Sequence, residues 1–116
     1  GCLSLLASVA GTPFATPLGD ALLFLEDIDE PLYRIDRMLT QLDLSGSLTA
    51  IRAMILGASI ASPSDADALA QIRDRAGDRT VVCGLPAGHT TPNLTLPLGC
   101  PARIDTESSH LVIEHP

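Results

Sequence analysis

The chain has 116 residues, of which 46% are hydrophobic. This length and composition predict a single globular domain, residues 1–116, with an apolar core of its own. Seven basic residues stand against 14 acidic ones, giving a formal net charge of −7, so we expect no nucleic-acid partner. No apolar run reaches the roughly 20 residues that a membrane-spanning helix requires, and we expect no membrane partner either.

The cysteines indicate neither a disulfide framework nor a zinc site. Cys2, Cys83 and Cys100 are odd in number, and none of them belongs to a CxxC pair. We therefore expect no metal and no cofactor. Reduced cysteines are typical of the cytoplasm, which is the location we expect. Because the sequence starts at Gly1 and not at methionine, it gives no evidence on a targeting segment.

Helices are expected in the first two thirds of the chain. Residues 3–9 predict one or two helical turns. Pro31 suits a first helical position, and apolar residues then recur at three- and four-residue spacing until Gly46. A third helix is expected to begin after Ser64 as its cap and to end at Gly77.

Strands are expected throughout, and they dominate the last third. The expected strands cover residues 21–25, 53–57, 81–83, 94–96, 102–105 and 110–114. The first run is apolar without interruption, which is typical of a strand that is buried on both faces. Strands that alternate with helices, followed by a β-rich C-terminal third, predict an α/β fold.

Four carboxylates follow the first expected strand, within residues 26–30. Such a cluster is usually solvated, and Asp29 and Glu30 precede a helix, whose N-terminal dipole favours anions. Glu26 differs because it is joined directly to the apolar run. Its side chain should emerge at the carboxyl end of a central strand, where open α/β sheets place functional groups.

A stiff loop with two glycines and two prolines begins at Gly84 and presents His89. An unperturbed histidine titrates near pH 6.5, so it can accept and return a proton at neutral pH. A histidine in a loop is more often a surface residue than a catalyst, and the loop alone does not decide between these functions.

Three segments of the chain carry recognisable motifs. They are residues 88–99 (GHTTPNLTLPLG), residues 23–27 with 33–39 (LFLED and YRIDRML), and residues 1–6 (GCLSLL). In this order they resemble the histidine motif, the glutamate strand with its following helix, and the opening of the C-terminal half of the LD-carboxypeptidase family. That family comprises the muramoyltetrapeptide carboxypeptidases and the microcin-immunity-type serine peptidases. The resemblance covers nearly the whole chain and implies a swivelling β/β/α-type domain with a mixed sheet and flanking helices.

The resemblance also implies roles for individual residues. The family uses a Ser-Glu-His triad, in which His89 matches the general base and Glu26 its carboxylate partner. The nucleophilic serine of the family belongs to an N-terminal domain that these 116 residues do not contain. Ser62 and Ser64 flank Pro63 in a connector and do not resemble a nucleophile elbow. We therefore expect a serine-type peptidase in the full-length parent and no activity from this chain alone.

The implied reaction is hydrolysis of LD-peptide bonds, with release of D-alanine from murein tetrapeptide during cell-wall recycling. The microcin-immunity branch cleaves peptidyl-nucleotides instead, and the sequence does not decide between the two branches. The implied partners are the murein peptide and the N-terminal domain of the same protein. We also expect a homodimer, because the face that such a domain would cover should be exposed and apolar.

Two other functions remain open from the residues. The first is a non-catalytic binding or assembly module of the same fold, in which Glu26 would not contact His89. The second is a cysteine hydrolase that uses Cys83 or Cys100 near His89, although Cys83 lies within an apolar run and suits a small core residue better.

Overall fold

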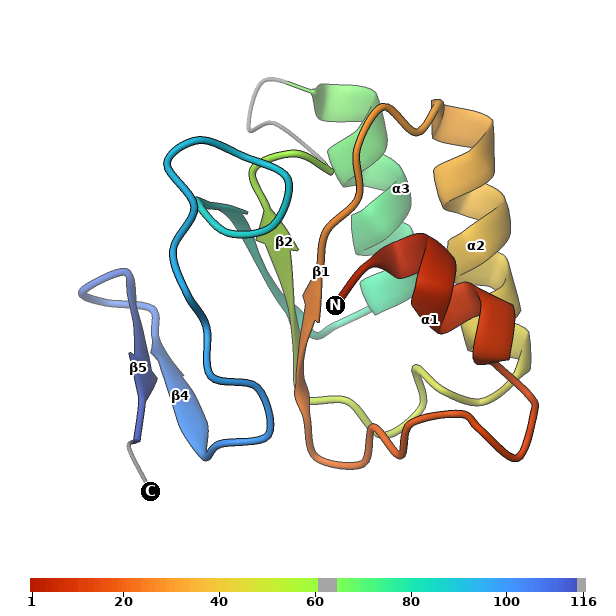
Figure 1. Ribbon diagram of the computed structural model, residues 1–116, viewed down its shortest axis with the longest axis horizontal. Helices are drawn as coiled ribbons and strands as arrows, with labels where there is room; N and C mark the ends of the chain where they lie inside the picture. Colours follow the sequence, from red (N-terminus) through yellow and green to blue (C-terminus); the bar gives the residue numbers. More distant parts are fainter. Residues whose placement is uncertain (61–64, 115–116) are drawn as a thin grey trace.

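A computed structural model describes residues 1–60 and 65–114 (Figure 1). Within these residues the chain forms, in order, α1 (Leu3–Val9), β1 (Leu22–Leu25), α2 (Leu32–Leu44), β2 (Ala53–Gly57), α3 (Ala66–Ala76), β3 (Thr80–Leu85), β4 (Ala102–Asp105) and β5 (His110–Ile113). Strands and helices alternate as far as β3, and an antiparallel pair follows. The predicted α/β fold is confirmed.

The strands pair in two separate sheets. The parallel sheet has the order β1-β2-β3, and α2 and α3 make its two crossover connections. Its register pairs Leu23 with Met54, and Met54 with Val81. The second sheet is the β4-β5 hairpin, in which Ala102 pairs with Ile113.

These elements stack in three layers. Figure 1 shows the three helices on one side of the parallel sheet and the β4-β5 hairpin on the other side. The order of the layers is therefore β, β, α, as expected for a β/β/α-type domain. Parallel and antiparallel pairing both occur, one in each sheet.

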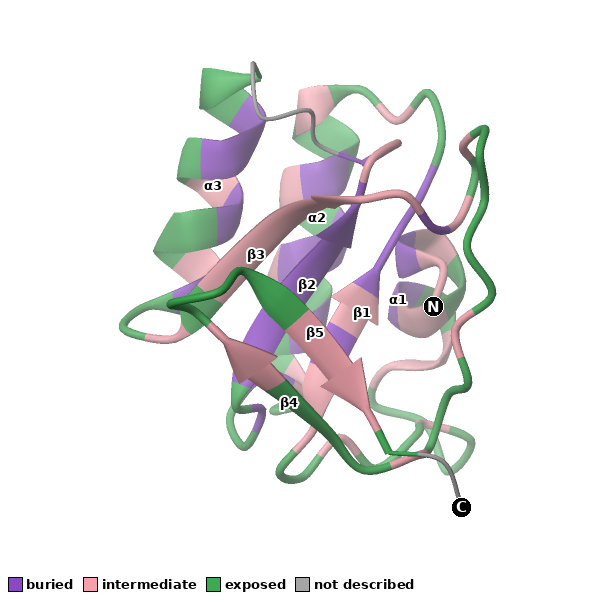
Figure 2. Ribbon diagram, turned by 90° about the vertical axis from the view of Figure 1, so that its left-hand side faces the viewer, coloured by how far each residue is buried: buried purple, intermediate pink, exposed green. Residues whose placement is uncertain are grey.

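The core lies between the parallel sheet and the helices (Figure 2). The largest side chains that are fully buried are Leu3, Leu25, Leu39, Leu42, Leu48, Met54, Leu56 and Ile72. All five residues of β2 are buried, because β2 is the middle strand and both of its faces are covered.

The outer strand β1 differs from the expectation. Leu23 and Leu25 are buried, whereas Leu22 and Phe24 are only half-buried, so one face of β1 is incompletely covered. The prediction that Glu26 follows a central strand is wrong, since β1 is at the edge of the three-stranded sheet. A single parallel bridge between Cys2 and Glu26 extends the pairing on that edge.

Some expected element boundaries are also corrected. Residues 94–96 form no strand, because the backbone amide of Leu94 bonds to the carbonyl of Pro86 and closes the loop on itself, at 2.7 Å. Pro31 lies just before α2 in an extended conformation. The carboxylate of Asp65 caps α3 by accepting from the amide of Ala68 at 3.1 Å. The expected cap, Ser64, is outside the described residues.

In the described part of the chain, every helix is too short or too polar to cross a membrane.

Candidate active site

Glu26 directly follows β1, at the carboxyl end of the parallel sheet. Its backbone is fixed on both sides by the N-terminal segment. The amide of Leu3 donates to the carbonyl of Glu26 at 2.8 Å, and the amide of Glu26 donates to the carbonyl of Gly1 at 3.1 Å. The side chain is only 10% exposed. A carboxylate in this position is held on a rigid element and is largely shielded from water.

His89 lies in the loop that follows β3, and this loop is fixed by hydrogen bonds of its own. The amide of Gly88 donates to Oδ1 of Asn93 at 3.0 Å, and the amide of Leu94 donates to the carbonyl of Pro86 at 2.7 Å. The amide of Ala58 donates to the carbonyl of Leu85 at 2.9 Å, which ties the start of the loop to the end of β2. The sequence pattern of glycine and proline therefore produces an ordered loop around the imidazole.

The structure brings these two predicted site residues together. Nδ1 of His89 lies 2.5 Å from Oε2 of Glu26, although the residues are 63 positions apart in the sequence. Half of the histidine side chain is exposed, whereas the glutamate is nearly buried. No hydrogen bond within residues 1–60 and 65–114 involves Nε2 of His89. When Nδ1 of His89 carries the proton, it donates to Glu26, and Nε2 is then the unprotonated ring nitrogen.

Asp27 is a further buried carboxylate, and sequence reasoning missed it by grouping it with its solvated neighbours. It is only 5% exposed. Its Oδ2 accepts from the amide of Ser4 at 2.9 Å and from the thiol of Cys2 at 3.6 Å, and its Oδ1 accepts from the amide of Ile28 at 3.0 Å. The side chain of Cys2, at the N-cap position, does not cap α1. The first amides of α1 therefore need another acceptor, and this need was the signal that could have identified Asp27 as their partner.

The pKa of Asp27 reflects two opposing effects. Burial raises the pKa, but hydrogen bonds from the amides of Ser4 and Ile28, the hydroxyl of Ser4 and the thiol of Cys2 lower it. The hydrogen bonds prevail, and the pKa lies below the ordinary value of 3.8. Asp27 therefore links the start of α1 to the end of β1 as a charged group, directly beside Glu26.

The remaining acidic residues of this segment have no contact with His89. Asp29 is exposed, and Glu30 forms an ion pair with Arg34 one helical turn later, at 2.9 Å. Both residues precede α2, and the expectation of a solvated carboxylate fits Asp29 but not Glu30, whose side chain is only 12% exposed.

None of the three cysteines is hydrogen-bonded to His89 within the described residues, although the backbone of Cys2 is bridged to that of Glu26. All three are free thiols. Cys83 packs against the apolar core, and no hydrogen bond among the described residues joins Cys83 or Cys100 to His89. Nor do histidine, cysteine or acidic side chains in the described ranges gather in a group of three or more that could hold a metal ion.

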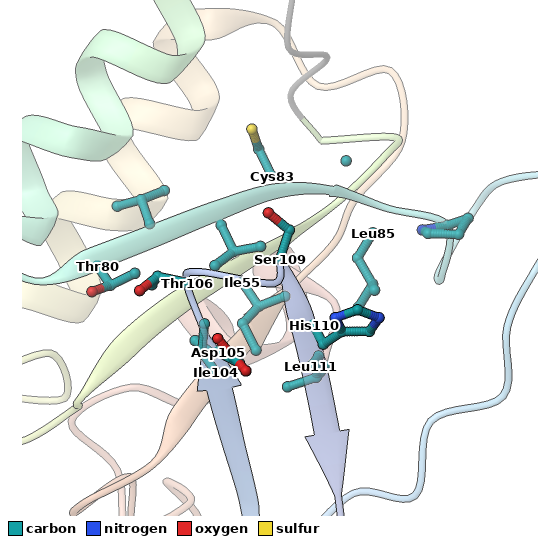
Figure 3. A pocket seen from close by; sticks show the side chains of 14 residues that line it. Ile55, Thr80, Cys83, Leu85, Ile104, Asp105, Thr106, Ser109, His110 and Leu111 are labelled. Carbon is teal, nitrogen blue, oxygen red and sulfur yellow. The ribbon is translucent and has the colours of Figure 1, made fainter.

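Two hollows lie on the hairpin side of the parallel sheet. The first, of about 490 Å³, is an open hollow between β3 and the hairpin, and Ile55, Leu85 and Leu111 supply much of its apolar wall (Figure 3). The second, of about 460 Å³, lies between β1 and the hairpin. Neither Glu26 nor His89 lines these two hollows. The site is therefore defined by its hydrogen-bonded pair and not by either of these two hollows.

Comparison with known proteins identifies relatives of this arrangement. Residues 1–104 match the model of the LD-carboxypeptidase C-terminal domain. The chain is 39% identical to a Streptomyces coelicolor protein that is provisionally named a carboxypeptidase, with all of the chain and 38% of that protein aligned. It is 37% identical to a Bacillus subtilis protein named a probable murein peptide carboxypeptidase, over 98% of the chain and 38% of that protein.

Solved structures agree with the sequence relatives. The muramoyltetrapeptide carboxypeptidase of Oxalobacter formigenes superimposes with a TM-score of 0.82 at 35% identity, over all of this chain and 44% of that one. The microcin C7 self-immunity protein MccF, in complex with aspartyl sulfamoyl adenosine, gives a TM-score of 0.81 at 27% identity, over all of this chain and 36% of its own. The chain thus spans between 36% and 44% of the length of these relatives. It belongs to the LD-carboxypeptidase family, and it corresponds to the C-terminal domain of that family.

Proposed function

We propose that this chain is the C-terminal catalytic part of a serine-type LD-carboxypeptidase, in which Glu26 and His89 are two members of a Ser-Glu-His triad. The observation that carries the proposal is the 2.5 Å contact between Nδ1 of His89 and Oε2 of Glu26. A non-catalytic module would not need this contact, and the cysteine-hydrolase alternative has no thiol bonded to the imidazole.

The geometry suits the proton transfers of amide hydrolysis. In the proposed reaction, Nε2 of His89 accepts the proton of a serine hydroxyl while the serine oxygen attacks the carbonyl carbon of the LD-peptide bond. Glu26 stabilises the resulting imidazolium through Nδ1. His89 then donates the proton to the departing amine of D-alanine, and the acyl-enzyme ester is hydrolysed by a water molecule that His89 deprotonates in turn.

The nucleophilic serine would come from a part of the protein outside these 116 residues. Two facts support this proposal. The relatives are more than twice as long as the chain, and no hydrogen bond in the described ranges joins a serine to His89. The chain alone would then hold a general base with no attacking group, and we expect it to release no D-alanine from murein tetrapeptide.

Within the family, we propose the murein-peptide branch. The chain is 37% identical to the Bacillus subtilis protein and 35% identical to the Oxalobacter enzyme, against 27% for MccF. The proposed substrate is murein tetrapeptide that is recycled in the cytoplasm. Offering the full-length protein both murein tetrapeptide and an aminoacyl or peptidyl-nucleotide conjugate would distinguish the branches, and faster cleavage of the conjugate would contradict this assignment.

The triad assignment is tested by substitution in the full-length protein, with release of D-alanine as the measurement. His89→Ala and Glu26→Gln should each lower kcat by about 10⁴-fold, as observed when the carboxylate partner of a triad histidine is neutralised. His110→Ala is a matched control, because His110 is exposed on β5 and outside the proposed triad. Release of D-alanine by the His89→Ala protein at the wild-type rate would refute the proposal.

A further inference from the structure

Two glycines lie directly against the side chain of Glu26, and neither is required by the triad assignment. Gly57 is the last residue of β2, and Gly88 is the residue immediately before His89. Both approach Glu26 so closely that a single added methyl group would collide with it. The two positions come from different segments, so their close approach to one glutamate side chain is a property of the tertiary structure.

Gly88 faces the whole length of the Glu26 side chain. A Cβ atom at this position would lie 2.7 Å from Cβ, from Cγ and from Oε2 of Glu26. The φ angle of Gly88 is +96°, a conformation that residues with a side chain rarely adopt. Glycine at this position therefore lets the loop carry the imidazole to the carboxylate without displacing it.

Gly57 also approaches the side chain of Glu26, at the end of β2, where the pairing with β3 is irregular. A Cβ atom here would lie 2.7 Å from the carbonyl oxygen of Ala87 and 2.9 Å from Cβ of Glu26. Neither neighbour can move freely. Glu26 is held on the sheet by backbone hydrogen bonds, and Ala87 lies in the loop that bonds to the end of β2.

We propose that Gly57 and Gly88 are positioning residues that place the carboxylate of Glu26 against Nδ1 of His89. Any side chain at either position forces apart the strand end and the histidine loop, and these are the two elements that the contact joins. The effect on turnover rests on the proposed function. The effect on the contact does not, and it can be measured separately.

The contact is read from the tautomer of His89. The measurement is ¹⁵N NMR of the ring nitrogens at about pH 9, well above the pKa of about 6.5 of an unperturbed histidine. An isolated neutral imidazole favours the proton on Nε2, whereas donation to Glu26 requires it on Nδ1. The wild-type chain should show the Nδ1–H form. Gly88→Ala and Gly57→Ala should shift His89 to the Nε2–H form.

The chain offers a matched control for each variant. Gly99 has a φ of +79° but no atom within 4 Å of the position that an added methyl group would take, so Gly99→Ala introduces the backbone strain without the collision. Gly19→Ala is the control for Gly57→Ala, because neither glycine has a positive φ. An added Cβ at Gly19 would have no atom within 4 Å. Both controls should keep the Nδ1–H form of His89. A Gly57→Ala and a Gly88→Ala chain that keep this form as well would overturn the proposal.

Loss of folding is also informative. If Gly88→Ala fails to give a folded amide spectrum, adding Glu26→Gly removes the three atoms that its methyl group would strike and should restore folding. The methyl group of Gly57→Ala would also strike the carbonyl oxygen of Ala87, so this rescue is made with Gly88→Ala alone. Failure of that double variant to fold would overturn the proposal, because the collision would then not be the cause.

In the full-length protein, both alanine variants should lower kcat about a hundredfold with little change in KM, the effect expected when a catalytic group is misplaced by about 1 Å. The Gly99→Ala and Gly19→Ala proteins should retain the wild-type kcat. A tautomer shift in the two variants together with full activity of the His89→Ala protein would refute the proposed function and leave the positioning role intact. Lower kcat with an unchanged Nδ1–H form would refute the positioning role.

Discussion

Replacing Asp27 by alanine should weaken the fold at the point where the site is assembled. The substitution removes a carboxylate that accepts hydrogen bonds from the amides of Ser4 and Ile28 and from the thiol of Cys2. The amide of Ser4 belongs to the first turn of α1 and has no other helical partner. Its partly buried N–H is left without an acceptor, while the amide of Ile28, beside an exposed side chain, can reach water.

The magnitude follows from these contacts. A hydrogen bond to a charged group contributes about 1.5–3 kcal/mol, and a buried donor left unsatisfied costs a similar amount. With one amide left unpaired and the other partly rehydrated, we expect Asp27→Ala to lower the free energy of unfolding by about 3 kcal/mol. A change of this size is a large fraction of the stability of a small domain.

The effect should depend on pH in a defined direction. The folded pKa of Asp27 lies below its ordinary value of 3.8, so the unfolded chain binds this proton more tightly than the folded chain does. The stabilisation is fully present above the unfolded pKa and is lost as the pH falls through the folded pKa. The difference in unfolding free energy between the wild type and Asp27→Asn should therefore be constant near neutral pH and shrink below about pH 4.

Urea unfolding of the 116-residue chain measures both quantities. Asp74→Ala is the control, since Asp74 is exposed on α3, and its effect should stay within about 0.5 kcal/mol. The reasoning is refuted if Asp27→Ala costs no more than Asp74→Ala. A wild-type advantage over Asp27→Asn that persists unchanged into acid would refute the charge-dependent part alone.

Further predictions concern the core, the loop and association. Leu39 is fully buried, and Leu39→Ala should lower the free energy of unfolding by about 2–5 kcal/mol. Leu44 is exposed, and Leu44→Ala should lower it by less than about 0.5 kcal/mol in the same urea titration. Asn93→Ala removes the acceptor for the amide of Gly88, so hydrogen exchange at that amide should speed up while core amides stay protected. Cys83→Ser should lower stability and leave D-alanine release by the full-length protein unchanged, because the thiol packs against the core. Finally, the chain alone should self-associate as a dimer, and a monomer in light scattering at high concentration would contradict this.

Much of the local structure could be predicted from the sequence because it depends on local patterns. The apolar run at 53–57 and the three- and four-residue spacing after Pro31 correctly predicted β2 and α2. The motif around His89 indicated the family, which the comparisons confirm. Glu26 and His89 were selected as site residues by residue type and motif alone, and the structure places them in contact.

Other features depend on contacts between distant segments, which no local pattern encodes. Strand order decided that β1 is an edge strand, although its apolar run resembles that of a middle strand. Residues 94–96 have strand-like composition, but a hydrogen bond to Pro86 takes the amide that a sheet would need. The burial of Asp27 depends on where α1 begins in space, and its neighbours in the sequence are solvated.

The sequence by itself therefore determined most of the helices and strands, the family and the two residues with the right chemistry, because propensity, periodicity and motif spacing act along the chain. Only the tertiary structure decided how those residues meet. The 2.5 Å contact between Glu26 and His89 requires a strand end and a loop that are 63 residues apart to pack without intervening side chains. That close approach is possible because Gly57 and Gly88 have no Cβ atom. A Cβ at either position would collide with Glu26, which is near these glycines in space but distant from them in the sequence.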